Sequence, residues 1–325
     1  PAFSSRAMST PTVLKPEELK PAADLCARTL EQLDRILLGR ADVHRLVLIG
    51  ILSRGHILLE GLPGLGKTAL IRTLGRILQL DFKRVQFTPD LMPGDVLGTH
   101  ILQDTESGQR AMTFQPGPVF TNILLADEIN RATPKTQSAL LEAMQEHTVT
   151  SGTTTHELEA PFLVMATQNP IEMEGTYPLP EAQLDRFMFN IVIEHPPEDE
   201  EMQVVRTTTA ILEPQFNRPV SGPDLIAFQR LVRRVPVSEA VLRYAVSIVR
   251  TSRPKADNAP ETIKKFAAFG ASVRAAQFLI LGAKARALTN GRYHVSFEDI
   301  RALAHPVLRH RVLTNFRAES EGYTR

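Results

Sequence analysis

Eight residues, GLPGLGKT at positions 61–68, constrain the fold of this 325-residue chain more than any other stretch. They match G-x-x-x-x-G-K-[ST], in which backbone N–H groups close around phosphate oxygens while the lysine and threonine reach the terminal phosphates and Mg²⁺. The apolar run HILLEG leads into the loop, and KTALIRTLGRILQ follows it with a helical pattern. A loop placed between a buried strand and a helix predicts a nucleotide site. The residues expected to hold the nucleotide are Gly61, Leu62, Pro63, Gly64, Leu65, Gly66, Lys67 and Thr68.

A second apolar strand, ILLADE at 123–128, ends in two carboxylates. Ligands of open α/β sheets bind at the carboxyl ends of the strands, so both side chains are expected near the phosphate loop. Asp127 is predicted to hold Mg²⁺ through water, with Thr68 as a direct ligand, and Glu128 to polarise the attacking water. The alternative is a solvated strand end, which the nearby phosphate loop makes the weaker interpretation.

A third strand, FLVMATQNP, ends in Gln168 and Asn169. If this strand lies between the other two, Asn169 reaches the γ-phosphate and the water beside Glu128. An amide orients water there without adding charge. A strand-end asparagine considered alone is more often a cap or turn residue, but the order of the three motifs along the chain favours the nucleotide site.

Composition and missing motifs narrow the class of protein. The chain is 43% hydrophobic and 22% charged, which is typical of a globular protein, and its apolar runs are too short to span a bilayer. One cysteine, Cys26, allows no intrachain disulfide. With no secretory signal evident, we expect a cytoplasmic location. The chain lacks both N-K-x-D, the base-reading motif of GTPases, and LSGGQ, the signature of transporter ATPases.

Charge divides the chain into two parts. Residues 1–197 carry 17 Lys and Arg against 23 Asp and Glu, whereas residues 198–325 carry 20 against 13. Such asymmetry marks either a nucleic-acid surface or two oppositely charged domains that attract each other between subunits, and we favour the second. Residues 1–15 are expected to be a flexible start, with PAFSSRA ahead of Met8 foreign to the natural chain. A leading helix follows, and the nucleotide-binding core is predicted to span 16–197.

Five motifs in a fixed order, GLPGLGKT, ILLADEIN, ATQNP, LPEAQLDRF and GASVRAAQ, resemble the MoxR family of AAA+ ATPases. The resemblance covers nearly the whole chain. It implies an α/β fold, in which a parallel sheet sandwiched by helices carries two β-hairpin insertions and is followed by a small all-α lid domain at 198–325. It also implies ATP and Mg²⁺ as cofactors, a hexameric ring, and a partner containing a von Willebrand factor A domain that recruits a client protein for maturation.

The resemblance also assigns two arginines. Arg186, in LPEAQLDRF, matches the arginine finger that reaches the γ-phosphate on a neighbouring subunit; the alternative is an arginine paired locally with Asp185 or Glu181. Arg274, in GASVRAA, matches the second sensor. Arg274 lies at the start of a predicted apolar helix. The helix dipole disfavours a cation at this end, so a contact with phosphate would explain why an arginine is found there. Whether that phosphate belongs to its own nucleotide or to a neighbour's stays open.

Two insertions, 99–114 and 147–158, are each predicted to form a hairpin around a Ser-Gly turn. Their tips are polar and lack the aromatic-hydrophobic-glycine loop of threading unfoldases. In the family resembled, such hairpins point towards the pore of the ring. A DNA-acting motor or a magnesium-chelatase-like subunit shares this plan, but the segments hold more acidic than basic residues. A scaffold that binds nucleotide without hydrolysis would be expected to lack Glu128 or Arg186.

Overall fold

A five-stranded parallel sheet forms the centre of the computed structural model, which describes residues 15–36, 40–62, 64–104, 110–169, 175–209 and 220–322. The strand order is β2-β5-β8-β1-β9, so the strand that ends in Gln168 lies between the other two motif strands, which is the condition under which Asn169 is expected to reach the nucleotide site. The strands are β1 (Ile57–Gly61), β2 (Phe82–Gln86), β5 (Ile123–Asp127), β8 (Leu163–Gln168) and β9 (Phe189–Ile193).

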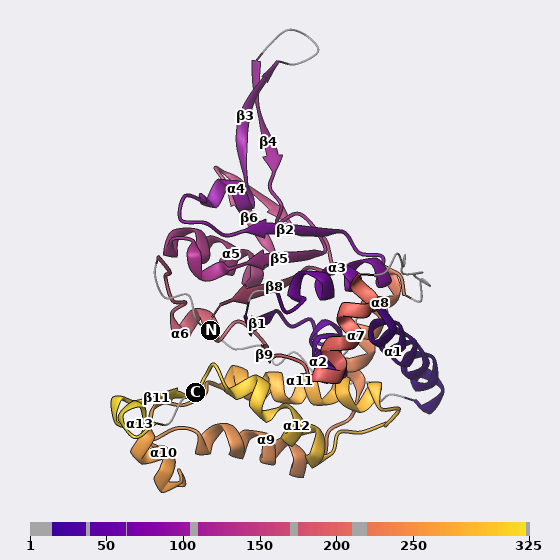
Figure 1. The fold of residues 1–325 in the computed structure, drawn as a ribbon, viewed down its shortest axis with the longest axis vertical. Coiled ribbons are helices and arrows are strands. Elements are labelled where there is room, and N and C mark those ends of the chain that lie inside the picture. The colour runs from indigo at the N-terminus through magenta and orange to yellow at the C-terminus, as the bar shows by residue number, and fades with distance from the viewer. Residues whose placement is uncertain are drawn as a thin grey trace, which may run out of the picture.

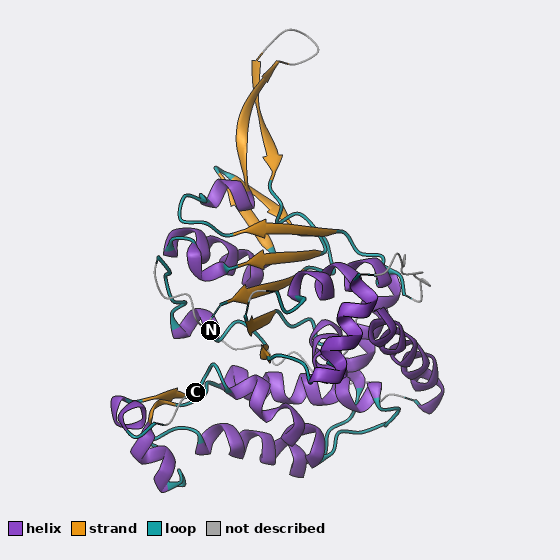
Figure 2. Ribbon diagram, in the orientation of Figure 1, coloured by secondary structure: helices purple, strands orange, loops and turns teal. Residues whose placement is uncertain are grey.

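Helices cover both faces of this sheet, because alternate strand residues point to opposite sides. Leu59 packs into one apolar cluster with the first three helices, whereas its neighbour Leu58 packs into a second cluster on the other face. Figure 2 shows the strands enclosed by helices. The helical elements of this part are α1 (Pro16–Ile36), α2 (Ala41–Leu52), α3 (Lys67–Ile77), α4 (Pro93–Leu97), η1 (Ile129–Arg131), α5 (Pro134–Glu146) and α6 (Glu181–Leu184).

Both predicted hairpins are present, as β3 (Gly98–Asp104) with β4 (Arg110–Pro116) and β6 (Thr148–Ser151) with β7 (Thr154–Glu157). The first hairpin extends far beyond the sheet along the long axis (Figure 1), and the Glu-Ser-Gly turn predicted at its tip lies outside the described residues. The two hairpins touch each other. The ring of His156 stacks on Phe114 with 4.0 Å between centroids, and Ser151 Oγ lies 3.1 Å from His100 Nδ1.

The second part is mainly helical, as predicted, and adds a two-stranded ribbon of β10 and β11 that the sequence patterns do not indicate. Its long helix α11 contacts α1 and α2 of the first part. One apolar cluster therefore runs through both parts, and we propose the boundary at 197 and 198 as a chain division rather than a break in packing. The elements are α7 (Glu198–Thr208), α8 (Gly222–Arg234), α9 (Glu239–Thr251), α10 (Glu261–Phe266), β10 (Ala267–Phe269), α11 (Val273–Thr289), α12 (Phe297–Leu308), β11 (Leu313–Thr314) and α13 (Phe316–Ser320).

The predicted fold class is confirmed by this arrangement. At one end of the molecule β3 and β4 project from the sheet, and at the opposite end lie helices α9 to α13, which we call the lid (Figure 1). None of the helices in the described parts of the chain combines the length and the apolar character needed to cross a bilayer.

Candidate functional site

The phosphate loop joins β1 to α3 through residues that only glycine tolerates well. Gly64 and Gly66 have φ angles of 84° and 78°, and Gly66 is the N-cap of α3. A Cβ on Gly61 would lie 2.5 Å from the carbonyl oxygen of Ile193, so glycine is needed where β1 passes β9. These conformations leave the N–H groups of the first turn of α3 directed at the loop, as an anion site requires.

The ammonium group of Lys67 lies over this loop, where Nζ donates to the carbonyl oxygen of Gly61. Thr68 is the next residue of α3 and is half-buried. Leu62 is half-buried at the end of β1, and Leu65 lines the cavity described below, while Pro63 lies outside the described residues. The loop residues predicted from the motif are therefore gathered at the start of α3.

Asp127 ends β5 and Glu128 follows it, and the two side chains lie in different surroundings. Asp127 is 8% exposed, and its Oδ1 accepts from the Thr167 hydroxyl at 2.5 Å. The same hydroxyl accepts from the main-chain N–H of Glu128 at 2.8 Å, while Glu128 has a φ of 55°. This left-handed conformation turns the Glu128 side chain away from the course of the strand. Thr167 of β8 thus fixes the carboxylate of one residue and the backbone of the other.

Two residues of β2, which the sequence patterns do not single out, bind these carboxylates. Arg84 donates to Asp127 Oδ2 from Nε at 2.9 Å and from Nη2 at 2.7 Å. Gln86 donates from Nε2 to Glu128 Oε2 at 2.7 Å, and Arg131 Nε lies 3.0 Å from the same oxygen. The period-2 alternation of the FKRVQ strand, with Arg84 and Gln86 on one face, is the signal that could have found them.

Asn169 directly follows β8 and is 5% exposed. Its position at the carboxyl end of the strand between β5 and β1 places it on the edge that also carries Glu128 and the phosphate loop. A buried amide at this edge can orient a water molecule or a phosphate oxygen through its two donors and its carbonyl acceptor.

Thr68 and Asp127 offer one hydroxyl and one carboxylate, a donor set that fits Mg²⁺. This ion keeps several waters and takes only one or two protein ligands besides substrate phosphates. Within the described residues no three His, Cys, Asp or Glu side chains come together as an all-protein metal site. The residues therefore fit an ion that is held mainly by phosphate and water.

A cavity of about 450 Å³ adjoins the phosphate loop, and it was not predicted from the sequence. Its size is that of a small-molecule pocket, and its walls are mostly apolar. Arg40 caps the start of α2, and its Nη1 donates to the carbonyl oxygen of Glu194, the residue after β9. This hydrogen bond links the α2 side of the cavity to the β9 side. Residues from α2, α3, β9 and α7 line the cavity, among them Val43, His44, Leu70, Ile193, Glu201 and Val204. An adenine base fits this lining.

Arg186 lies two residues after α6 and is half-buried. Its Nη1 donates to the carbonyl oxygen of Leu141 in α5, so the local pairing considered with Asp185 or Glu181 does not occur among the described contacts. Arg186 does not line the cavity beside the phosphate loop. Figure 1 shows α6 and α7 on opposite sides of the molecule, and α7 is the element that borders this cavity.

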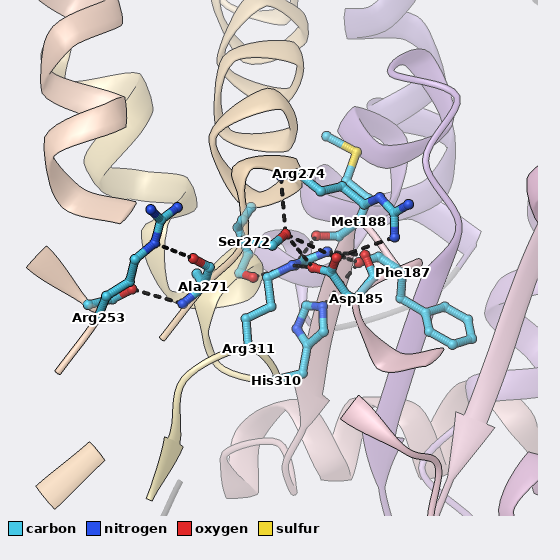
Figure 3. A network of polar contacts seen from close by, with 11 residues as sticks. Asp185, Phe187, Met188, Arg253, Ala271, Ser272, Arg274, His310 and Arg311 are labelled. Atoms are coloured by element: carbon cyan, nitrogen blue, oxygen red, sulfur yellow. Dashed lines mark hydrogen bonds and ion pairs between the residues drawn. The ribbon is translucent and has the colours of Figure 1, made fainter. Parts of the chain in front are cut away.

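Asp185, the residue before Arg186, binds three residues of the lid (Figure 3). Arg274 Nη1 lies 3.3 Å from Asp185 Oδ2, and the hydroxyl of Ser272, which caps α11, donates to the same carboxylate. Arg311 donates from Nε to Oδ1 at 2.7 Å. The carboxylate thus offsets the unfavourable position of Arg274 at the start of α11.

Two buried groups of the lid lie beside this carboxylate. Burial lowers the pKa of Arg311 to about 10, and the hydrogen bond that Arg311 donates to Asp185 opposes that change. Burial also lowers the pKa of His310 to about 3, with the adjacent charge of Arg311 adding to the effect. His310 is therefore neutral, and its Nε2 donates to the carbonyl oxygen of Phe187 at 3.0 Å.

Comparisons with known proteins agree with this geometry. A family model described as "ATPase family associated with various cellular activities (AAA)" matches residues 56–189, and one described as "AAA lid domain" matches 261–325. "Chaperone MoxR1" of Mycobacterium tuberculosis is 42% identical over 291 residues, which cover 90% of this chain and 76% of that protein. "Protein MoxR" of Paracoccus denitrificans is 34% identical over 303 residues, which cover 86% of each.

A solved structure is similar as well. The crystal structure of a provisionally named ATPase from Cytophaga hutchinsonii superposes with a TM-score of 0.87 at 42% identity, covering 94% of this chain and 92% of that one. The matches extend over the phosphate loop, the Asp127-Glu128 strand and the lid in a single alignment. This chain belongs to the MoxR family of AAA+ ATPases.

Proposed function

We propose that this protein hydrolyses ATP with Mg²⁺ at the phosphate loop. The observation that carries the proposal is that Lys67, Asp127 and Glu128 lie at the carboxyl edge of one parallel sheet, where β8 separates β1 from β5. The apolar cavity beside the loop takes the adenine base, and the first turn of α3 takes the phosphates.

Each residue has a separate task in this proposal. Lys67 balances the charge of the terminal phosphates, and Thr68, together with Asp127 through water, would hold Mg²⁺, which would supply further positive charge to the phosphates. Glu128 polarises the attacking water, and Asn169 orients that water or a γ-phosphate oxygen. Gln86 holds the Glu128 carboxylate at 2.7 Å, so it sets the direction from which Glu128 meets the water.

Arg186 and Arg274 act on the nucleotide of a neighbouring subunit. Both arginines lie beside Asp185, because Arg186 is the next residue in the chain and Arg274 forms an ion pair with it. Neither arginine lines the cavity beside the phosphate loop of its own chain. A cation supplied across an interface is worth roughly 10³ to 10⁵ in rate in phosphoryl transfer. The site is then complete only in an oligomer, which we take to be a hexameric ring.

ATP hydrolysis in this ring drives remodelling or maturation of a client protein in the cytoplasm. The projecting hairpin pair and the lid transmit the change in subunit geometry, and a protein with a von Willebrand factor A domain delivers the client. Support for this role comes from the chaperone name of one relative and from the position of the hairpins at the end of the molecule opposite the lid.

Phosphate release by purified protein, with and without Mg²⁺, tests the activity. Glu128→Gln should retain nucleotide binding and lose turnover, because the amide cannot polarise water. Lys67→Ala should instead weaken binding. Turnover by Glu128→Gln equal to that of the unchanged protein would remove Glu128 from the proposed role.

A further inference from the structure

A second cavity lies on the face of the sheet opposite to the cavity beside the phosphate loop. Its volume is about 320 Å³, at the lower end of the range for small-molecule pockets. Leu184 in its wall belongs to the apolar cluster on this face, whereas Ile193 beside the phosphate loop belongs to the cluster on the other face. Residues of β1, β8 and β9 form its floor and Arg309 and His310 of the lid border it, so we call it the lid-side cavity.

The three strands give this cavity a polar floor. Gln168 of β8 and Val192 of β9 are the register partners of Glu60 in β1, and Asn190 lies two residues before Val192. Every second side chain of a strand points to the same face of the sheet. The floor of the cavity therefore carries two amides and a carboxylate, where residues further along the same face are apolar.

Two buried hydrogen-bond acceptors border the lid-side cavity without a partner. Asn190 is 3% exposed, and its Oδ1 accepts no hydrogen bond from the part of the chain that the structure describes. His310 is 4% exposed, and because its Nε2 donates to Phe187 (Figure 3), its Nδ1 is an acceptor that is likewise unpaired among the described residues. Buried polar atoms are costly unless they are paired, so a molecule that brings donors into the cavity would be stabilised there.

Three charged side chains also line the cavity. Glu60 and Arg309 are half-buried and Glu194 is exposed, and no ion pair within 4.0 Å involves any of the three among the residues described. Two carboxylates disfavour a phosphate. A divalent ion fits less well too, since no three His, Cys, Asp or Glu side chains in the described ranges come together. Walls that hold separate charges of both signs match a molecule that carries an ammonium and a carboxylate.

We propose that the lid-side cavity binds a free amino acid. Its ammonium group donates to Glu60 and to Oδ1 of Asn190, and its carboxylate accepts from Arg309. Apolar wall residues, among them Leu179 and Leu184, take its side chain. Glu60 and Asn190 belong to the sheet and Arg309 to the lid, so the bound molecule joins the two parts of the chain.

Isothermal titration calorimetry on the nucleotide-free protein tests this site without any measurement of hydrolysis. Each of the common amino acids is titrated separately. The tightest is then compared with the amine that lacks its carboxylate and the acid that lacks its ammonium group. We expect one molecule bound per chain and a loss of roughly tenfold or more with each analogue, because each leaves a wall charge unpaired. No binding of any amino acid, or equal binding of either analogue, would overturn the proposal.

Substitutions of the charged wall residues should act locally. Glu60→Gln and Arg309→Met should each weaken binding by roughly tenfold, because hydrogen bonds to charged groups are lost. The matched controls are Glu181→Gln on α6 and Arg301→Met on α12, which are exposed and do not line the cavity. Both controls should bind as the unchanged protein does. Equal affinity in a wall variant and its control would contradict the proposed contacts.

Asn190→Leu separates binding from folding. Since Oδ1 of Asn190 accepts no hydrogen bond from the described residues, chemical unfolding should show no loss of stability in this variant. Binding of the amino acid should be abolished, because the leucine removes the acceptor and occupies part of the cavity. Unchanged binding, or a loss of stability that reveals a structural partner for the amide, would refute the role given to Asn190.

ATP added to the same titration distinguishes the two cavities. The amino acid should stay bound at saturating ATP, because the nucleotide cavity lies on the other face of the sheet. Competitive displacement by ATP would place the amino acid in the nucleotide cavity and overturn the proposal. A protein that binds the amino acid but releases no phosphate would contradict the proposed activity and leave the lid-side site intact.

Discussion

Asp185 binds Arg311 through two different oxygen atoms. Its Oδ1 accepts from Arg311 Nε at 2.7 Å, and its main-chain carbonyl accepts from Nη2 at 2.8 Å. Arg311 is 6% exposed, and it also donates to the carbonyl oxygen of Phe187 at 2.5 Å (Figure 3). The guanidinium group of Arg311 thus binds Asp185 and Phe187, the residues before and after Arg186 in the chain. A movement of the lid would therefore shift the backbone that carries the proposed arginine finger.

Asp185→Ala should destabilise the protein, because the buried guanidinium of Arg311 would lose its carboxylate partner. Removing one member of such a pair costs about 3–5 kcal/mol. Chemical unfolding measures the change. Glu239→Ala, which removes an exposed ion pair with Arg243 on α9, should cost less than about 1 kcal/mol. Equal losses in the two variants would show that Asp185 does not support the lid.

Stability should fall as the pH drops below about 6.5. Burial lowers the pKa of His56 to about 4 and that of His310 to about 3, so the unfolded chain takes up protons before the folded one does. Between pH 6.5 and these values each histidine therefore opposes folding, by about 2 kcal/mol at pH 5. Above pH 6.5 both states are neutral and the effect vanishes.

Unfolding followed at pH 5 and pH 7.5 checks this sign. His310→Gln should reduce the difference between the two pH values, whereas His195→Gln, at an exposed position, should not. The lowered pKa of Asp299, about 2, affects stability only at more acidic pH. A protein equally stable at both pH values would refute the assignment of neutral buried histidines.

Arg84→Met should lower the Mg²⁺ concentration needed for half-maximal hydrolysis. Arg84 neutralises the Asp127 carboxylate, and its side chain is 46% exposed, so the pair is worth about 0.2–1 kcal/mol, or roughly a 1.4- to 5-fold change. A titration of phosphate release with Mg²⁺ measures the shift. Lys83→Met, one residue earlier and directed at the carbonyl oxygen of Phe120, should leave it unchanged. A higher Mg²⁺ requirement in Arg84→Met would mean that Arg84 assists the site.

His156→Ala should loosen the long hairpin without affecting basal hydrolysis. The ring of His156 stacks on Phe114, and such pairs contribute about 0.5–1.5 kcal/mol. Amide hydrogen exchange in β3 and β4 should accelerate by roughly 2- to 10-fold, and Thr155→Ala, which is exposed on the same strand, should not change it. Unaltered exchange in His156→Ala would show that the two hairpins are independent.

Local patterns predict the parts of the site that lie along continuous segments. The strand, loop and helix at 57–77 and the strands that end in Asp127 and Gln168 follow from apolar runs and turn residues. The strand order stood only as a condition for the role of Asn169, and the sheet meets that condition. These features depend on neighbours in the sequence, which a single chain displays directly.

The missed features depend on distant pairings. The cavity beside the phosphate loop combines Val43, Ile193 and Val204, which no spacing rule connects. Strand β2 has one buried residue, Val85, so its pattern is too polar to stand out. Asp185 was considered as a partner of the adjacent Arg186, but the fold brings Arg311 to it from 126 residues away.

The central claim is that each ATP is hydrolysed by residues of two subunits. ATPase rate against mixing ratio for Lys67→Ala and Arg186→Ala tests it most directly, since a mixed ring contains interfaces with one intact loop and one intact finger. We predict that the mixture exceeds the sum of the separate variants and peaks near equal proportions. Rates that never exceed that sum, with subunit exchange demonstrated, would contradict the account and leave Arg186 as a structural ligand of Leu141.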